Sequence, residues 1–170
     1  VYALCFETPK EEIKYLKQVQ QIDDQLPITY FSLGNLYNIR LHQYDKAIPE
    51  LERSLELYSK WGSKPMWVLN YTSLGLAYHK TCQYKKEHQL YKKAEVDFPE
   101  DPRLLYRQSV LSLTERDTIE AIKYITKYQT IRKEELWNDS EIASNLGDIY
   151  TEAGLLDKAE KYYRDALVTD

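Results

Sequence analysis

Residues 33–37, which read LGNLY, decide the fold because their pattern returns twice along the chain. It recurs as LGLAY at residues 74–78 and as LGDIY at residues 146–150. Each copy has leucine directly before the glycine and tyrosine three residues after it, and each precedes a turn and a second helix-compatible stretch. Three such matches are hard to obtain by chance. They predict an all-α protein built from repeated pairs of antiparallel helices.

The second helix of each pair has a pattern of its own. Small residues are expected to face the gap that each glycine leaves, so that the two helices approach closely, and large apolar residues are expected to fill the space between hairpins. The small residues are Ala47, Ala121 and Ala159, with Ser54, Ala94 and Ala166 seven positions after this site, and the large ones are Leu51, Tyr91, Ile125 and Tyr163. Tyr37, Tyr78 and Tyr150 are interpreted as core residues, and Tyr44 and Tyr84 as the openings of second helices.

This pattern resembles the tetratricopeptide repeat, whose period is about 34 residues. With Gly34, Gly75, Ser109 and Gly147 as equivalents, the spacings are 41, 34 and 38 residues. The longer spacings indicate insertions around His42 and residues 59–65, and around residues 132–139. The resemblance implies a right-handed superhelical stack of helix hairpins, an α-solenoid, in which neighbouring hairpins bury each other's apolar faces. The style of the repeats is similar to that of bacterial members of the family.

The repeats are expected to form one continuous domain over residues 27–170. The third is degenerate, since Gln108, Ser109 and Ser112 replace leucine, glycine and tyrosine, and the second has Glu87 where a small residue is expected. Before them, Thr8 and Glu11 make a capping box with proline at the first helical position. The expected segments are an N-terminal partial repeat at 1–26, with 1–6 as the end of its first helix, and four repeats at about 27–67, 68–101, 102–139 and 140–170.

Composition narrows the class of function. The chain has 170 residues with a formal net charge of -4, which disfavours nucleic acid as the main partner. No apolar stretch is long enough for a membrane span. Cys5 and Cys82 fit neither a disulfide framework nor a metal knuckle, so two reduced thiols are expected, which favours the cytoplasm. The chain opens at Val1 and looks like a piece of a longer protein, so further repeats or a self-association surface are expected beyond its ends.

No catalytic constellation is recognisable in the sequence. His79 and Cys82 have a spacing that can hold one metal ion, but without a third ligand a solvated turn is the simpler interpretation. Adjacent carboxylates such as Glu11 and Glu12 point about 100° apart on a helix, which does not suit a shared acid–base site. We therefore expect no enzyme activity, no cofactor and no metal.

In arrays of this family, the first helices of successive hairpins line a concave groove, and residues outside the packing pattern contact the ligand. The resemblance therefore places several polar side chains in a peptide-binding groove. These are Asn35, Asn38, Thr72, His79, Arg103, Tyr106, Arg107 and Asn145, with Phe31, Ser144 and Asp148 beside them.

Arg103 and Arg107 are four residues apart and so share one helix face. They resemble the basic pair with which chaperone-binding members of the family grip the carboxylates of a peptide, and Asn35 matches an asparagine of that clamp. Phe31 and Ser73 replace its lysine and its second asparagine, so the match is incomplete. One hypothesis is that the pair binds an acidic group of a peptide. The alternative is that both arginines are solvated or paired with acids of adjacent helices.

The expected function is a non-catalytic scaffold that binds a protein or peptide segment, with an acidic group as a candidate feature of the ligand. The alternative is a regulatory or self-association segment that docks on its own chain or a second copy, with Trp61, Pro65 and Trp67 as a hydrophobic contact. A third hypothesis is that the repeats select the substrate of a catalytic domain elsewhere in a longer chain. The chain is expected to be a monomer or a weak dimer.

Overall fold

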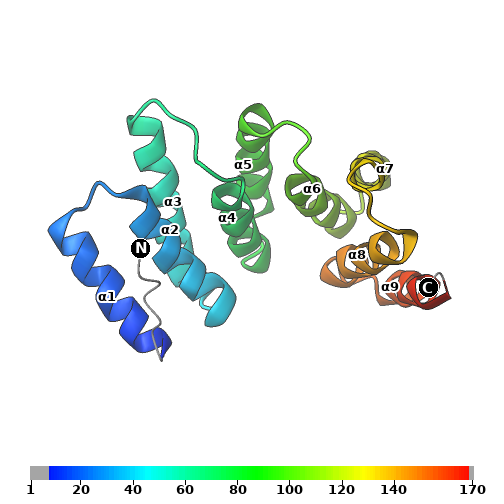
Figure 1. Ribbon diagram of the computed structural model, residues 1–170, viewed down its shortest axis with the longest axis horizontal. Coiled ribbons are helices and arrows are strands. Elements are labelled where there is room, and N and C mark those ends of the chain that lie inside the picture. Colours follow the sequence, from blue (N-terminus) through cyan, green and yellow to red (C-terminus); the bar gives the residue numbers. More distant parts are fainter. Residues whose placement is uncertain (1–7, 169–170) are drawn as a thin grey trace. The chain divides into compact units, whose positions relative to one another are not determined.

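The computed structural model describes residues 8–168, and all the regular structure in that range is helical. The helices are α1 (Pro9–Ile22), α2 (Pro27–Asn35) with the π-helical turn η1 (Leu36–Arg40), α3 (Tyr44–Lys60), α4 (Leu69–Lys80), α5 (Tyr84–Asp97), α6 (Pro102–Thr114), α7 (Thr118–Glu134), α8 (Asp139–Glu152) and α9 (Leu156–Val168). Figure 1 shows these helices, with neighbouring ones such as α2 and α3, or α8 and α9, lying side by side. The expected all-α class is confirmed, and within this range no helix is long and apolar enough to cross a membrane.

The helices group into two compact units, residues 1–93 and 94–170, with α5 beginning in the first and ending in the second. In the first unit α2 packs on α3, and α3 packs on α4. In the second unit α6 packs on α7, and α8 packs on α9. Sequential helices thus pair as antiparallel hairpins, as the repeat predicts.

The start of α1 follows directly from its sequence. Thr8 Oγ1 accepts a hydrogen bond from the backbone N–H of Glu11 at 3.3 Å, and the Glu11 carboxylate accepts one from the N–H of Thr8 at 3.1 Å. This reciprocal pair satisfies two N–H groups that the first helical turn leaves without partners. The predicted capping box is confirmed. The proposed helix remnant at 1–6, which includes Cys5, lies outside the described residues.

The repeated glycines sit where two helices touch, but their neighbours are not the expected ones. A Cβ atom on Gly34 would lie 2.6 Å from Leu51 Cγ, and a Cβ atom on Gly75 would lie 2.2 Å from Tyr91 Oη. The large residue of the second helix, not the small one, therefore lies over each glycine, and the prediction that a small residue faces this gap is wrong. The reason is volume: without a Cβ atom, the first helix leaves room for a bulky side chain.

The extra residue of the first repeat is absorbed inside its first helix. Gly34 precedes the second helix by ten residues, whereas Gly75 precedes its own by nine. The additional residue is accommodated by the wider π-helical turn η1, in which the N–H of Leu41 donates a hydrogen bond to the carbonyl of Leu36 at 3.2 Å. The expected insertion around His42 thus lies upstream of that residue. His42 itself, with φ 51°, is equivalent to the turn residue Cys82 of the next hairpin, with φ 57°.

The other inserted residues extend second helices and the connections after them. Helices α3 and α7 are each 17 residues long, compared with 14 in α5 and 13 in α9. The repeat thus tolerates extra length after the helix–helix contact has been made. Tyr37, Tyr78 and Tyr150 are all buried, as expected for core residues.

Candidate peptide-binding surface

In the first unit, two of the predicted groove residues, Asn35 of α2 and Asn38 of η1, meet at Ser73 of α4. Asn35 is half-buried and its Oδ1 accepts a hydrogen bond from Ser73 Oγ at 2.9 Å. Asn38 is fully buried in the π-helical turn and donates from Nδ2 to the carbonyl of Ser73 at 2.8 Å. Both amides thus hold one residue of α4. Asn35 keeps part of its side chain at the surface, whereas the buried Asn38 and Thr72 serve the packing.

The fourth first-unit residue, His79, belongs to a buried pair that the sequence did not predict. Its Nδ1 lies 3.1 Å from Glu87 Oε2, and the two side chains are 9% and 1% exposed. Glu87 stands where the other repeats have alanine, and this carboxylate has a specific partner in His79. The signal in the sequence was Glu87 alone, because the equivalents of His79 in the first and last repeats, Asn38 and Thr151, are polar as well.

Cys82 does not complete a ligand set with this pair. It is exposed, and its Sγ accepts a hydrogen bond from Tyr84 Oη at 3.6 Å. Among residues 8–168, no three His, Cys, Asp or Glu side chains come together in a way that could hold a metal ion. The His79 side chain therefore contacts Glu87 and the ring of Tyr84, whose centroid lies 5.4 Å from that of His79.

In the second unit, Arg103 lies in the first turn of α6 and binds the residue that caps this helix. Its Nε and Nη2 donate to the two oxygens of Asp101 at 3.0 and 2.8 Å, a bidentate pair. Burial alone would raise the pKa of Asp101, but the hydrogen bonds from Arg103 outweigh it and hold this pKa below its usual value. The Arg103 side chain is still 53% exposed, so its outer edge faces solvent.

Arg107, one turn further along α6, reaches across to α8. Its Nη1 donates to Glu152 Oε2 at 2.5 Å, and its guanidinium lies 5.1 Å from the ring centroid of Tyr106. Tyr106 also donates from its hydroxyl to Glu152 Oε1 at 2.8 Å. Burial, and then the charge of Glu152, raises the pKa of the Tyr106 phenol, so this group stays a hydrogen-bond donor at neutral pH. The Glu152 carboxylate thus binds both predicted residues, Tyr106 and Arg107.

The last predicted residue, Asn145, donates from Nδ2 to the carbonyl of Glu141 within its own helix at 2.9 Å and remains half-buried. The second unit therefore brings together Arg107, Tyr106 and Glu152, with Arg103 on the same helix. Arg107 thus pairs with an acid of an adjacent helix, as the alternative interpretation of the sequence stated, but the sequence did not identify Glu152, which lies 45 residues away. A groove that joins residues of both units stays a prediction, since the structure defines each unit by itself.

Comparison with known proteins agrees with this architecture. Residues 25–95 and 140–167 each match the tetratricopeptide repeat family. The chain is a tetratricopeptide repeat protein. Neither match includes residues 102–139, where the third repeat has lost its signature, yet α6 and α7 still form a hairpin there.

Solved structures show the same fold for this tetratricopeptide repeat protein. MamA is 18% identical, with a TM-score of 0.68 over 98% of this chain and 96% of that one. PilW, a type IV pilus biogenesis factor, is 14% identical, with a TM-score of 0.68 over 91% of this chain and 67% of that one. A chain of the APC/C hetero-tetramer Cut9–Hcn1 is 20% identical, with a TM-score of 0.68 over 98% of this chain and 31% of that one. A comparison with curated protein sequences gives no significant match.

Proposed function

We propose that this tetratricopeptide repeat protein is a non-catalytic scaffold that binds a protein segment along its first helices, with a carboxylate of the ligand held by Arg103 and Arg107. Tetratricopeptide repeats generally serve as protein–protein interaction modules and are typically not catalytic. The chain of Cut9–Hcn1 that it resembles belongs to a hetero-tetramer, which agrees with such a role. The observation that carries the proposal is that both arginines lie on α6 and that each already binds a carboxylate, Asp101 for Arg103 and Glu152 for Arg107.

The internal acids indicate how a ligand would bind. Asp101 engages Arg103 with both oxygens, which is the geometry that an incoming carboxylate would adopt. The Arg103 side chain is 53% exposed, so a ligand carboxylate can reach its outer edge, whereas Asp101 is only 15% exposed. The Arg107–Glu152 pair is less exposed and shares Glu152 with Tyr106, so it is harder to displace. Arg103 is therefore the first contact, and Arg107 the positioned second one.

Peptides that end in aspartate or glutamate provide the test. Their affinity for the native protein is measured by fluorescence anisotropy, with C-terminally amidated peptides as the ligand control. The Arg103→Ala/Arg107→Ala variant is expected to bind at least about tenfold more weakly, since two charge-assisted hydrogen bonds contribute about 1.5–3 kcal/mol each. The matched control is Lys161→Ala/Arg164→Ala on α9, which removes the same charge at exposed positions.

Two further variants sharpen the test because they remove the competing acids. Asp101→Asn keeps a good helix cap while it weakens the ion pair with Arg103. Glu152→Gln weakens the ion pair with Arg107. Both are expected to tighten peptide binding. Equal affinities in the native protein and the double arginine variant, or no binding by any of the proteins, would reject the carboxylate clamp and favour arginines that serve only the fold.

A second candidate function, a regulatory or self-association segment, rests on the connection between α3 and α4. Trp61, Met66 and Trp67 are 53%, 68% and 44% exposed, and Leu69 beside them is 40% exposed. Such a group of large apolar side chains suits docking on another surface of the same protein or on a second copy. Light scattering is the measurement: a dimer that Trp61→Ser/Trp67→Ser converts to a monomer supports this function, and a native monomer excludes self-association.

A further inference from the structure

The outer face of α5 carries a basic stripe that the groove does not use. Lys85, Lys86, Lys92 and Lys93 are all exposed, and at about 100° per residue they fall within an arc of about 120°. The other exposed residues between positions 84 and 93, His88 and Gln89, carry no negative charge. Because α5 is the second helix of its hairpin, the stripe lies on a different helix from the residues of the predicted groove.

Most of these lysines lack the acidic partners that cations on comparable helices have. Lys60 on α3 pairs with Glu56 at 2.7 Å, Lys123 on α7 with Glu120 at 3.0 Å, and Arg164 on α9 with Glu160 at 2.5 Å. On α5, Lys86 lies 3.4 Å from Glu52. Within residues 8–168, the other three lysines of the stripe, at positions 85, 92 and 93, form no ion pair. Their charge is therefore available to an outside group.

The stripe also borders a hollow in the surface of the first unit. The hollow has a volume of about 460 Å³, and Leu90 and the ring of Tyr78 supply its apolar part. Glu52 is the one acidic residue among the described residues that line the hollow. It accepts a hydrogen bond from the Tyr78 hydroxyl and forms an ion pair with Lys86, whose Nζ lies 5.2 Å from the Tyr78 ring centroid. Lys92 and Lys93 line the same hollow, so its cations outnumber its acid by three to one.

The charges of the chain are distributed unevenly between the two units, and the unit that carries the stripe is the basic one. Residues 1–93 contain 13 Lys and Arg against 10 Asp and Glu, a formal net charge of +3. Residues 94–170 contain 10 Lys and Arg against 17 Asp and Glu, a net charge of -7. The stripe therefore lies on the unit with a positive net charge, although the whole chain is acidic. The net charge of this unit does not repel an acidic ligand.

We propose that the exposed face of α5 is a second interaction surface, which binds an acidic segment of a partner protein. The stripe rises about 12 Å from Lys85 to Lys93, which about four residues of an extended chain can follow. Between residues 84 and 93 no large apolar side chain is exposed that could insert into a lipid surface, which disfavours a membrane. No exposed aromatic residue alternates with the lysines to stack on bases, which disfavours single-stranded nucleic acid.

The test uses a fluorescein-labelled peptide of about six glutamates, with a peptide of six glutamines as the ligand control. Anisotropy is recorded at about 50 mM and about 300 mM NaCl, because exposed charges are screened beyond about 10 Å at 0.1 M salt. The native protein is expected to bind the glutamate peptide at low salt and to lose most of that affinity at high salt. The Lys85→Gln/Lys92→Gln/Lys93→Gln variant is expected to bind at least about fivefold more weakly, because it removes three exposed ion pairs with the peptide.

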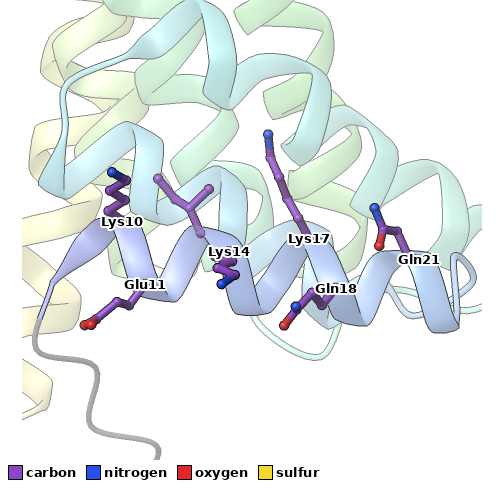
Figure 2. A pocket seen from close by; sticks show the side chains of 7 residues that line it. Lys10, Glu11, Lys14, Lys17, Gln18 and Gln21 are labelled. Atoms are coloured by element: carbon purple, nitrogen blue, oxygen red, sulfur yellow. The ribbon is translucent and has the colours of Figure 1, made fainter.

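Two control variants remove the same charge elsewhere. Lys60→Gln/Lys123→Gln/Arg164→Gln changes cations that already have acidic partners, and it is expected to keep the native affinity within about twofold. Lys10→Gln/Lys14→Gln/Lys17→Gln changes the three lysines that follow one another along α1 beside another hollow (Figure 2). It too is expected to bind as the native protein does.

An equal loss of affinity in all three variants would show that net charge alone attracts the peptide, and it would overturn the proposal. A loss confined to the α1 variant would move the site to α1. Vesicles of phosphatidylserine and phosphatidylcholine and a single-stranded DNA oligonucleotide are tested in parallel. If either binds through the α5 lysines more tightly than the glutamate peptide does, the partner is not an acidic protein segment.

Discussion

Replacement of Gly75 by alanine tests the close contact on which each hairpin depends. The new Cβ atom would lie 2.2 Å from Tyr91 Oη and 2.5 Å from both Cε1 and Cζ. Ordinary contacts of this kind lie at about 3.5–4.0 Å, so the ring must retreat by roughly 1 Å or more. Tyr91 is 2% exposed and therefore has little room to move.

The size of the effect follows from two opposing contributions. Overpacking a buried site costs about 1–3 kcal/mol, and a displaced buried ring lies at the upper end of that range. Alanine is favoured over glycine inside a helix by about 1 kcal/mol. We therefore expect Gly75→Ala to lower the free energy of unfolding by about 1–2 kcal/mol. If helix propensity alone mattered, the variant would be more stable than the native protein.

Urea denaturation followed by tryptophan fluorescence measures this change. Trp61 and Trp67 lie in the first unit and Trp137 in the second, so a Trp137→Phe background reports on the first unit alone. In Gly75→Ala/Tyr91→Ile, the smaller residue restores space, as Ile125 does in the repeat that has Ser109 in place of glycine, and part of the loss is expected to be recovered. A stabilised Gly75→Ala variant, or a double variant no better than the single one, would refute the packing argument.

Three other substitutions or conditions test the remaining features. Glu87→Ala is expected to lower the free energy of unfolding by about 1–3 kcal/mol because it removes the carboxylate that contacts the buried His79, and Glu87→Gln by less; urea denaturation of both variants and of His79→Ala measures this. Asn138 caps α8 by accepting a hydrogen bond from the N–H of Glu141 at 2.7 Å, so Asn138→Ala should cost about 1 kcal/mol and Asn138→Asp little, as measured by thermal denaturation. Burial, and then the charges of Glu95 and Glu120, raises the pKa of Tyr124 to about 12. Because this tyrosine loses its proton near pH 10 in the unfolded chain, the free energy of unfolding is expected to fall between pH 10 and 12. Tyr124→Phe should reduce that fall in urea denaturation curves recorded over a pH series.

Several features of the fold were predictable because they depend on local spacing. The glycines with their leucine and tyrosine neighbours predicted the hairpins, and the capping box at Thr8 and Glu11 predicted the start of α1. The loss of that spacing around Ser109 predicted the degenerate third repeat. Patterns over three to seven residues report helix faces and helix ends, since both are set by the helical period.

The candidate site was predictable only in part. The four-residue spacing of Arg103 and Arg107 correctly placed them on one helix, but their positions in the sequence did not indicate that Asp101 and Glu152 hold them. Conversely, the resemblance to known grooves included Asn38, which lies buried in a π-helical turn. Whether a polar side chain lies in the core or at the surface depends on what packs over it from another helix, and periodicity within its own helix does not report that.

The sequence LGNLY and its two copies thus determined by themselves that this protein is a series of helix hairpins. A glycine at a fixed place on a helix specifies that something approaches closely, whatever the approaching group is. Only the tertiary structure decided that the group is the large Leu51, Tyr91 or Tyr163 and not the small residue nearby. It also decided that Glu87 pairs with His79 and that Arg107 pairs with Glu152. These choices depend on distances between helices, which arise when side chains fill the available volume, and no local spacing records them.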